Sequence, residues 1–137
     1  MTVFQGDIVD IVHYDTGTPI VVQEQESVDI FGRLTDSHGN LLSKSAVATF
    51  TLTLFNESDG SIINGKNGTD ITSYLKDSGE FEVHLDGNDN SIMDASLGFL
   101  ELEKHIVLLT WTWTESSVTR TARSPLRIRV QNLGTVV

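Results

Sequence analysis

Histidine is the residue type in this chain best suited to acid–base or metal chemistry, and the chain has four of them. No two imidazoles have the i, i+4 spacing that places a pair on one helix face to bind a metal. His38 falls in a turn and His84 on the polar side of an alternating segment, and both are ordinary places for histidine. His13 lies in an N-terminal extended stretch, and His105 opens a tryptophan-containing segment. The histidines therefore predict neither a metal site nor a catalytic one.

Serine hydrolysis would need a nucleophile in a Gly-x-Ser-x-Gly turn, and the chain has no such string. Ser78 precedes Gly79 in a polar cluster typical of a turn. The absence of cysteine removes thiol nucleophiles, thiolate ligands and disulfides. Two carboxylates from distant strands could still meet as in a glycosidase, although a small β domain seldom has the deep cleft this requires. We expect no catalytic residues, no cofactor and no enzymatic activity.

An oxygen-rich loop is the one candidate metal site, because calcium prefers carboxylate and amide oxygens. Its candidate ligands are Asp86, Asn88, Asn90 and Asp94. The EF-hand pattern fails, since its sixth position is Ser91 and its twelfth is Leu97. The same residue types serve tight turns and helix caps, so turn chemistry is the alternative interpretation.

Trp111 and Trp113 share one face of a segment, two residues apart. Exposed, they would form a platform for stacking on sugars or an interface hot spot. The preceding residues 106–109 are apolar on both faces, which indicates a central strand. We therefore predict that both tryptophans belong to the core.

Charge is distributed unevenly along the chain. The net charge is −10, which argues against a nucleic-acid partner. Residues 1–103 hold 4 Lys and Arg against 18 Asp and Glu, whereas residues 104–137 hold 5 against 1. Four arginines lie close together near the end: Arg120, Arg123, Arg127 and Arg129. They could bind the acidic surface of another subunit, or pair across strands within the molecule.

Apolar and polar residues alternate in five segments, which is the period of half-buried strands: residues 27–34, 46–55, 80–85, 104–114 and 126–130. Clusters of Asp, Asn, Ser and Gly separate them at intervals typical of a β-sandwich or barrel. Residues 89–98 break this period. Their apolar residues have helical spacing, with Asp or Asn to cap the start and Gly98 to end it, so they predict one short helix between the sheets.

The two ends differ from the middle of the chain. We divide it into an extended N-terminal arm at residues 1–17, a sandwich domain at 18–131 and a C-terminal tail at 132–137. The start lacks the basic and apolar regions of a secretory signal, and no apolar run reaches the length of a membrane helix. Four apolar residues in the arm could pair with a neighbouring molecule, or the arm could be a frayed end: Ile8, Val9, Ile11 and Val12.

Several segments together resemble small immunoglobulin-like proteins from structural modules of tailed bacteriophages. An opening strand ends in the turn Leu34-Thr35-Asp36, a Thr-Phe-Thr-Leu strand follows at residues 49–52, and a Phe-x-Val-x-Leu strand follows at 81–85. A helical turn then leads into a long strand and a closing strand with an apolar ladder. The resemblance covers residues 18–131. It implies an immunoglobulin-like, two-sheet antiparallel β-sandwich of about seven to nine strands, and a virion component without catalytic residues.

From this resemblance we expect a capsid decoration or cement subunit, because no stalk or further segment follows the closing strand. A neck, tail or baseplate module and a carbohydrate-binding immunoglobulin-like module are the alternatives. The expected partners are the major capsid protein or other virion subunits, with homo-oligomers in the particle. The expected location is the virion, after assembly in the host cytoplasm. The arm would add a strand to a neighbour's sheet edge, and the four arginines would make the charged contact.

Overall fold

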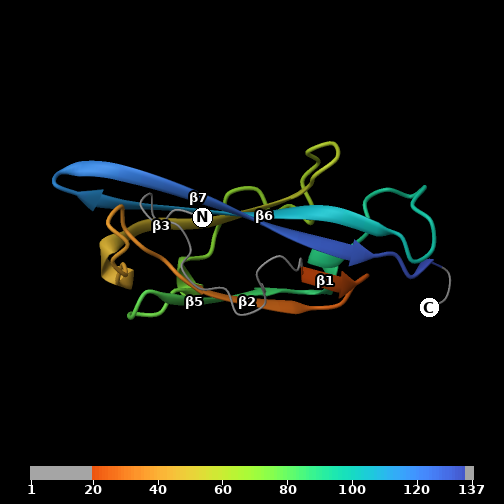
Figure 1. The fold of residues 1–137 in the computed structure, drawn as a ribbon, viewed down its shortest axis with the longest axis horizontal. Coiled ribbons are helices and arrows are strands. Elements are labelled where there is room, and N and C mark those ends of the chain that lie inside the picture. The colour runs from red at the N-terminus through yellow and green to blue at the C-terminus, as the bar shows by residue number, and fades with distance from the viewer. Residues whose placement is uncertain (1–19, 135–137) are drawn as a thin grey trace.

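The computed structural model describes residues 20–134, which form two β-sheets packed face to face (Figure 1). Seven strands lie within these residues: β1 Ile20–Gln23, β2 Val28–Arg33, β3 Val47–Asn56, β4 Thr69–Asp70, β5 Glu80–Leu85, β6 Leu102–Glu115 and β7 Val118–Gln131. Three short 3-10 helices connect some of them: η1 Lys44–Ala46, η2 Thr72–Tyr74 and η3 Gly87–Asn90. The prediction of an all-β, two-sheet fold is confirmed. The proposed arm, with Ile8, Val9, Ile11 and Val12, lies outside the described residues.

The larger sheet is organised around the long hairpin of β6 and β7. Its strand order is β1-β7-β6-β3-β4, and β6 pairs with β7 in antiparallel register from Leu102–Gln131 to Glu115–Val118. Ser116 and Ser117 join the two strands with φ angles of 51° and 65°. Positive φ at both positions is what a two-residue hairpin turn needs to match the twist of its strands. On the far side of β7, β1 pairs in parallel, so the prediction of purely antiparallel sheets is wrong at this edge.

The core fills the space between this sheet and the antiparallel pair of β2 and β5. Trp111 and Trp113 point inward from β6 and are 0% and 2% exposed, which confirms that they are core residues. The Trp111 indole Nε1 donates to the Thr35 carbonyl oxygen at 3.2 Å, so its polar atom is satisfied inside the core. Phe50 of β3 meets Phe81 of β5 edge to face, with centroids 5.3 Å apart, and so links the two layers.

The prediction of a short α-helix over residues 89–98 is wrong. The helical part is a single 3-10 turn, η3, and the chain then runs irregularly to β6. The Asp86 side chain caps η3 by accepting hydrogen bonds from the backbone N–H groups of Asn88 and Asp89. Within residues 20–134 no helix is long and apolar enough to span a membrane.

A carboxylate on β6 explains why the helix does not continue. Glu103 accepts hydrogen bonds from the backbone N–H groups of Met93 and Asp94, at 2.7 and 2.8 Å. In an α-helix these N–H groups would donate to carbonyls four residues earlier. Asn132, just after β7, also donates its side-chain N–H to the Leu97 carbonyl oxygen. Contacts with distant residues therefore hold the segment in an irregular path.

Gly79 occupies the tightest backbone position before β5, and its substitution tests this packing. Its φ is +91°, and an added Cβ would lie 2.3 Å from the Leu42 carbonyl oxygen. We expect Gly79→Ala to lower the free energy of unfolding by about 3 kcal/mol, from left-handed backbone strain plus overpacking. Gly60 is the matched control, since its φ is +75° but nothing lies within 4 Å of the added atom. Gly60→Ala should cost about 1 kcal/mol in urea unfolding. Equal costs for the two variants would contradict the predicted clash.

Candidate functional site

One side of the five-stranded sheet faces away from the core and carries a row of arginines. Along β7 the even-numbered residues from Ala122 to Val130 are buried, and the odd-numbered ones point outward. The strands β7, β6 and β3 form the layer opposite β2 and β5 (Figure 1). Their outward side chains define what we call the outer face: Thr51, Thr53, Phe55, Lys104, Ile106, Leu108, Thr110, Arg123, Pro125, Arg127 and Arg129.

The strand register gives the outer face an apolar centre. Pro125 on β7 lies opposite Leu108 on β6, and Arg127 lies opposite Ile106. Ile106 in turn lies opposite Phe55 on β3. Phe55 and Leu108 are half-buried and Pro125 is exposed, whereas Ile106 is buried. The outer face therefore combines apolar area with fixed positive charge, which is the composition of many protein interfaces.

The arginines of the outer face differ in how well they are paired inside the molecule. Arg127 donates from Nε to the Glu57 carboxylate at 3.0 Å, and its second guanidinium nitrogen contacts the same oxygen. Within residues 20–134, neither Arg123 nor Arg129 forms an ion pair. The Nε of Arg129 is buried and has no hydrogen-bond partner there. Pairing among the described residues therefore accounts for one of these three charges.

Arg120 is separated from the other three arginines. It lies opposite Trp113 near the hairpin end, on the inward-facing phase of β7. Its Nε is 3.8 Å from Glu115 Oε2. The four clustered arginines of the sequence thus divide between the outer face and the hairpin end.

The opposite side of the sandwich is acidic. On the outward side of β2 and β5, Asp29 lies opposite His84, and Arg33 lies opposite Glu80. Glu82 projects from the same side. The two sides of the sandwich therefore carry charge of opposite sign.

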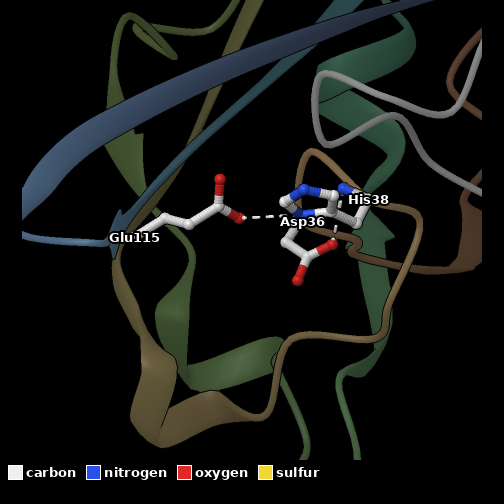
Figure 2. Close-up of side chains that lie close together, drawn as sticks. All are labelled: Asp36, His38 and Glu115. Carbon is white, nitrogen blue, oxygen red and sulfur yellow. Dashed lines mark hydrogen bonds and ion pairs between the residues drawn. The ribbon is translucent and has the colours of Figure 1, made fainter.

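Three chemically capable side chains that are distant in the sequence meet at the hairpin end (Figure 2). Asp36 and His38 come from the turn after β2, and Glu115 is the last residue of β6. One donor atom from each lies within 4.8 Å of the others, and His38 Nδ1 is 3.5 Å from Glu115 Oε1. Sequence reasoning placed His38 in a turn but missed this cluster, because no local spacing joins residues 38 and 115.

The Glu115 carboxylate is held in its charged form by its neighbours. The Ser37 hydroxyl donates to Oε2 at 2.5 Å. This hydrogen bond is the main cause that lowers the pKa of Glu115, and the indole N–H of Trp113 and the charge of His38 lower it further. Glu115 is therefore an ionised carboxylate with a fixed orientation.

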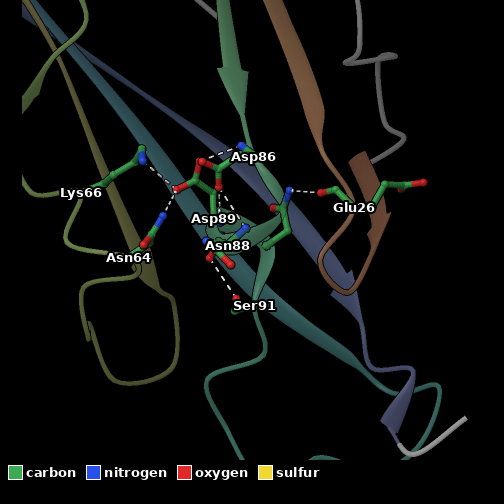
Figure 3. A network of polar contacts seen from close by, with 8 residues as sticks. Glu26, Asn64, Lys66, Asp86, Asn88, Asp89 and Ser91 are labelled. Atoms are coloured by element: carbon green, nitrogen blue, oxygen red, sulfur yellow. Dashed lines mark hydrogen bonds and ion pairs between the residues drawn. The ribbon is translucent and has the colours of Figure 1, made fainter. Parts of the chain in front are cut away.

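A buried carboxylate organises the turn that contains most of the calcium candidates (Figure 3). Asp89 is 1% exposed, and its Oδ1 receives Lys66 Nζ at 2.9 Å and Asn64 Nδ2 at 2.8 Å. Its Oδ2 accepts from the Asp86 backbone N–H at 2.9 Å. A buried charge needs such partners, so this network fixes the turn. The Asp86 side chain caps the turn by accepting a hydrogen bond from the backbone N–H of Asn88.

The remaining calcium candidates are used elsewhere. Asn90 is buried and donates from Nδ2 to the Glu26 carbonyl oxygen at 2.6 Å, which joins the turn to the β1–β2 connection. Asp94 accepts from the backbone N–H and hydroxyl of Ser96, and these bonds lower its pKa. Turn and cap contacts engage the carboxylates of Asp86 and Asp94, whereas Asn90 Oδ1 is buried without a hydrogen-bond partner within residues 20–134.

A pocket of about 310 Å³ lies beside the start of β6, between Asn56, Asp94 and Glu103. His105 is fully buried, and its Nε2 is 2.6 Å from Oε1 of Glu103, which lines the pocket. Because Glu103 also accepts the two backbone N–H groups described above, its oxygens are occupied by the fold. Glu103 and His105 together hold the irregular segment before β6 in place.

His84 gives a pH-dependent test of the acidic side. Its Nδ1 is 2.5 Å from Asp29 Oδ1, and this hydrogen bond is the main cause that raises the pKa of His84. A raised folded-state pKa means that the pair stabilises the fold below the unfolded-state pKa of about 6.5, and that the stabilisation is lost as pH rises through the folded-state value. Asp29→Asn should lower the His84 pKa in an NMR titration, whereas Asp77→Asn should leave it unchanged. An unchanged His84 in Asp29→Asn would refute the pairing.

Comparisons with protein-family models, curated proteins and solved structures give no match to this chain. The functional reading therefore depends on the chemistry of the outer face and of the side-chain clusters described above.

Proposed function

We propose that the chain is a non-enzymatic structural subunit of a tailed-phage particle, and that its outer face binds an acidic surface on a neighbouring virion subunit. The observation that carries this proposal is the row formed by Arg123, Arg127 and Arg129 on a chain whose net charge is −10. An excess of positive charge on one side of an acidic protein favours oriented contact with acidic neighbours. One such surface is the acidic side of another copy.

The strand order supports an immunoglobulin-like version of the sandwich. In that fold the second and fifth principal strands pair in one sheet, and the third, sixth and seventh form the other. Here β2 pairs with β5, and β3, β6 and β7 are neighbours in the larger sheet. The short β4 extends this sheet beyond β3, as an added strand does in variable-type domains. The chain lacks the inter-sheet disulfide of antibody domains, and its buried tryptophans lie on β6.

The outer face has the physical properties of a contact surface. Its apolar centre loses water when a partner covers it, which supplies affinity, and the arginines around it supply orientation and specificity. The buried Nε of Arg129 has no acceptor among the described residues 20–134. A carboxylate from a partner would satisfy this N–H with a charge-assisted hydrogen bond.

The carbohydrate-binding alternative has less support. A sugar platform needs aromatic rings exposed together on one face. Trp111 and Trp113 are buried, and Tyr74 is 41% exposed. Tyr14 lies outside the described residues.

A single charge reversal on the outer face tests the proposed contact. The apparent mass of the chain is measured by sedimentation velocity over a concentration series at low and high salt. We expect association that weakens with salt, because the contact depends on charge. Arg123→Glu should weaken it about tenfold at low salt. Lys76→Glu is the matched control, since it makes the same charge change on an exposed residue before β5 and should have no effect. Equal effects of both variants would contradict a specific contact.

The location in a particle is tested separately. Antibodies against the purified chain are applied to purified phage particles from the host that encodes it, and the bound antibody is located by electron microscopy. Labelling of the head supports a decoration or cement subunit, and labelling at the neck or tail supports the alternative position. Unlabelled particles, together with absence of the chain from their dissociated protein, would overturn the virion proposal.

A further inference from the structure

The cluster at the hairpin end has the donor set of a transition-metal site. Asp36 and Glu115 offer carboxylate oxygens and His38 offers an imidazole nitrogen, all within 4.8 Å of one another. Zinc binds such ligands at about 2.0–2.2 Å, which puts the donors of a tetrahedral site about 3.4 Å apart. The pair His38 Nδ1 and Glu115 Oε1 is already at 3.5 Å. The donor atom of Asp36 lies within 4.8 Å of both, and it would move closer to them when an ion binds.

The turn that carries two of the ligands is held by its own hydrogen bonds. Asp36 Oδ1 accepts from the backbone N–H groups of His38 and Asn40, at 2.8 and 3.0 Å. Gly39 takes a φ of +81°, which lets the turn close over the aspartate. On the other side, Ser37 donates to Glu115 and ties the turn to the end of β6. Such neighbours orient ligands in metal sites and raise affinity.

The indole of Trp113 is buried next to this cluster. Trp113 is 2% exposed, and its Nε1 is buried without a hydrogen-bond partner within residues 20–134. It lies close enough to the Glu115 carboxylate to help stabilise its charge. An unsatisfied buried N–H is costly. It would be relieved by an acceptor at the cluster, such as a water bound to a metal or a reoriented Glu115 oxygen.

We propose that Asp36, His38 and Glu115 bind one divalent transition-metal ion, with zinc as the best-matched metal. An imidazole ligand favours zinc, nickel or cobalt over calcium and magnesium, which prefer oxygen donors only. Three protein ligands leave a fourth position for water or for a donor from a neighbouring molecule. This site is independent of the outer face, since none of its ligands belongs to that surface.

The positive charge of Arg120 should weaken metal binding at this cluster, and its removal therefore tests the proposed site. Its Nε is 3.8 Å from Glu115 Oε2, so its charge repels a cation held by the same carboxylate. Removing this charge should strengthen metal binding. An increase in affinity cannot result from a misfolded variant.

The experiment is a calorimetric titration of the full chain with zinc chloride, repeated with nickel chloride. We expect one ion per chain. Glu115→Gln and His38→Ala should each weaken binding at least about tenfold, because each removes one of three ligands. Arg120→Gln should strengthen it several-fold. His84→Ala and His13→Ala are the matched controls, and both should bind as the unmodified chain does.

Tryptophan fluorescence adds a readout that locates the bound ion. Nickel or copper bound at Glu115 should quench the emission of Trp113 with the same midpoint as the calorimetric binding, and His38→Ala should lose this quenching. Circular dichroism of each variant establishes that it is folded. The proposal is overturned if zinc does not bind at millimolar concentration. It is also overturned if His38→Ala binds as tightly as the unmodified chain, or if His84→Ala or His13→Ala is the variant that loses binding.

Discussion

The antiparallel ladder between β6 and β7 is the interaction on which the other features depend. Its register runs over the full 14 residues of each strand and is closed by Ser116 and Ser117. Because successive side chains alternate between the two sides of a strand, one register decides the facing of every residue in the hairpin. It places the tryptophans of β6 in the core and three arginines of β7, Arg123, Arg127 and Arg129, on the outer face. A slip of one residue would reverse one of the two strands, and so would either expose the tryptophans or bury these three arginines, at a cost that is large against the stability of a small domain.

Alternation made the core and the strands predictable, because it is a local property of the chain. The inward phase of residues 104–114 and of 80–85 is the one observed, and both tryptophans are buried as expected. The same rule contained a signal that the sequence reading did not use. Arg120 has the parity of the buried residues on β7, whereas Arg123, Arg127 and Arg129 have the opposite parity. Their separation between two regions follows from that difference.

Features made by distant side chains could not be predicted in the same way. Residues 89–98 have helical spacing, but Glu103 takes the backbone N–H groups that a helix would use. The meeting of His38 with Glu115 depends on where the β2 turn and the end of β6 lie in space. Local sequence carries no information about that distance. The arm at residues 1–17 lies outside the described residues, and its role stays a prediction.

Two carboxylates in this sandwich, those of Asp89 and Glu115, differ in their burial and therefore in what they can bind. The carboxylate of Asp89 is enclosed, and Lys66, Asn64 and a backbone N–H neutralise and satisfy it, so it contributes a fixed turn. Glu115 lies at the edge of the core with a hydroxyl, a guanidinium and an imidazole around it, and its side chain keeps 19% of its exposure. A buried pair that is complete in itself has no capacity for a ligand. A partly exposed carboxylate held in place by neighbours retains that capacity. For this reason we propose a bound metal ion at the hairpin end and not at the more enclosed Asp89 network.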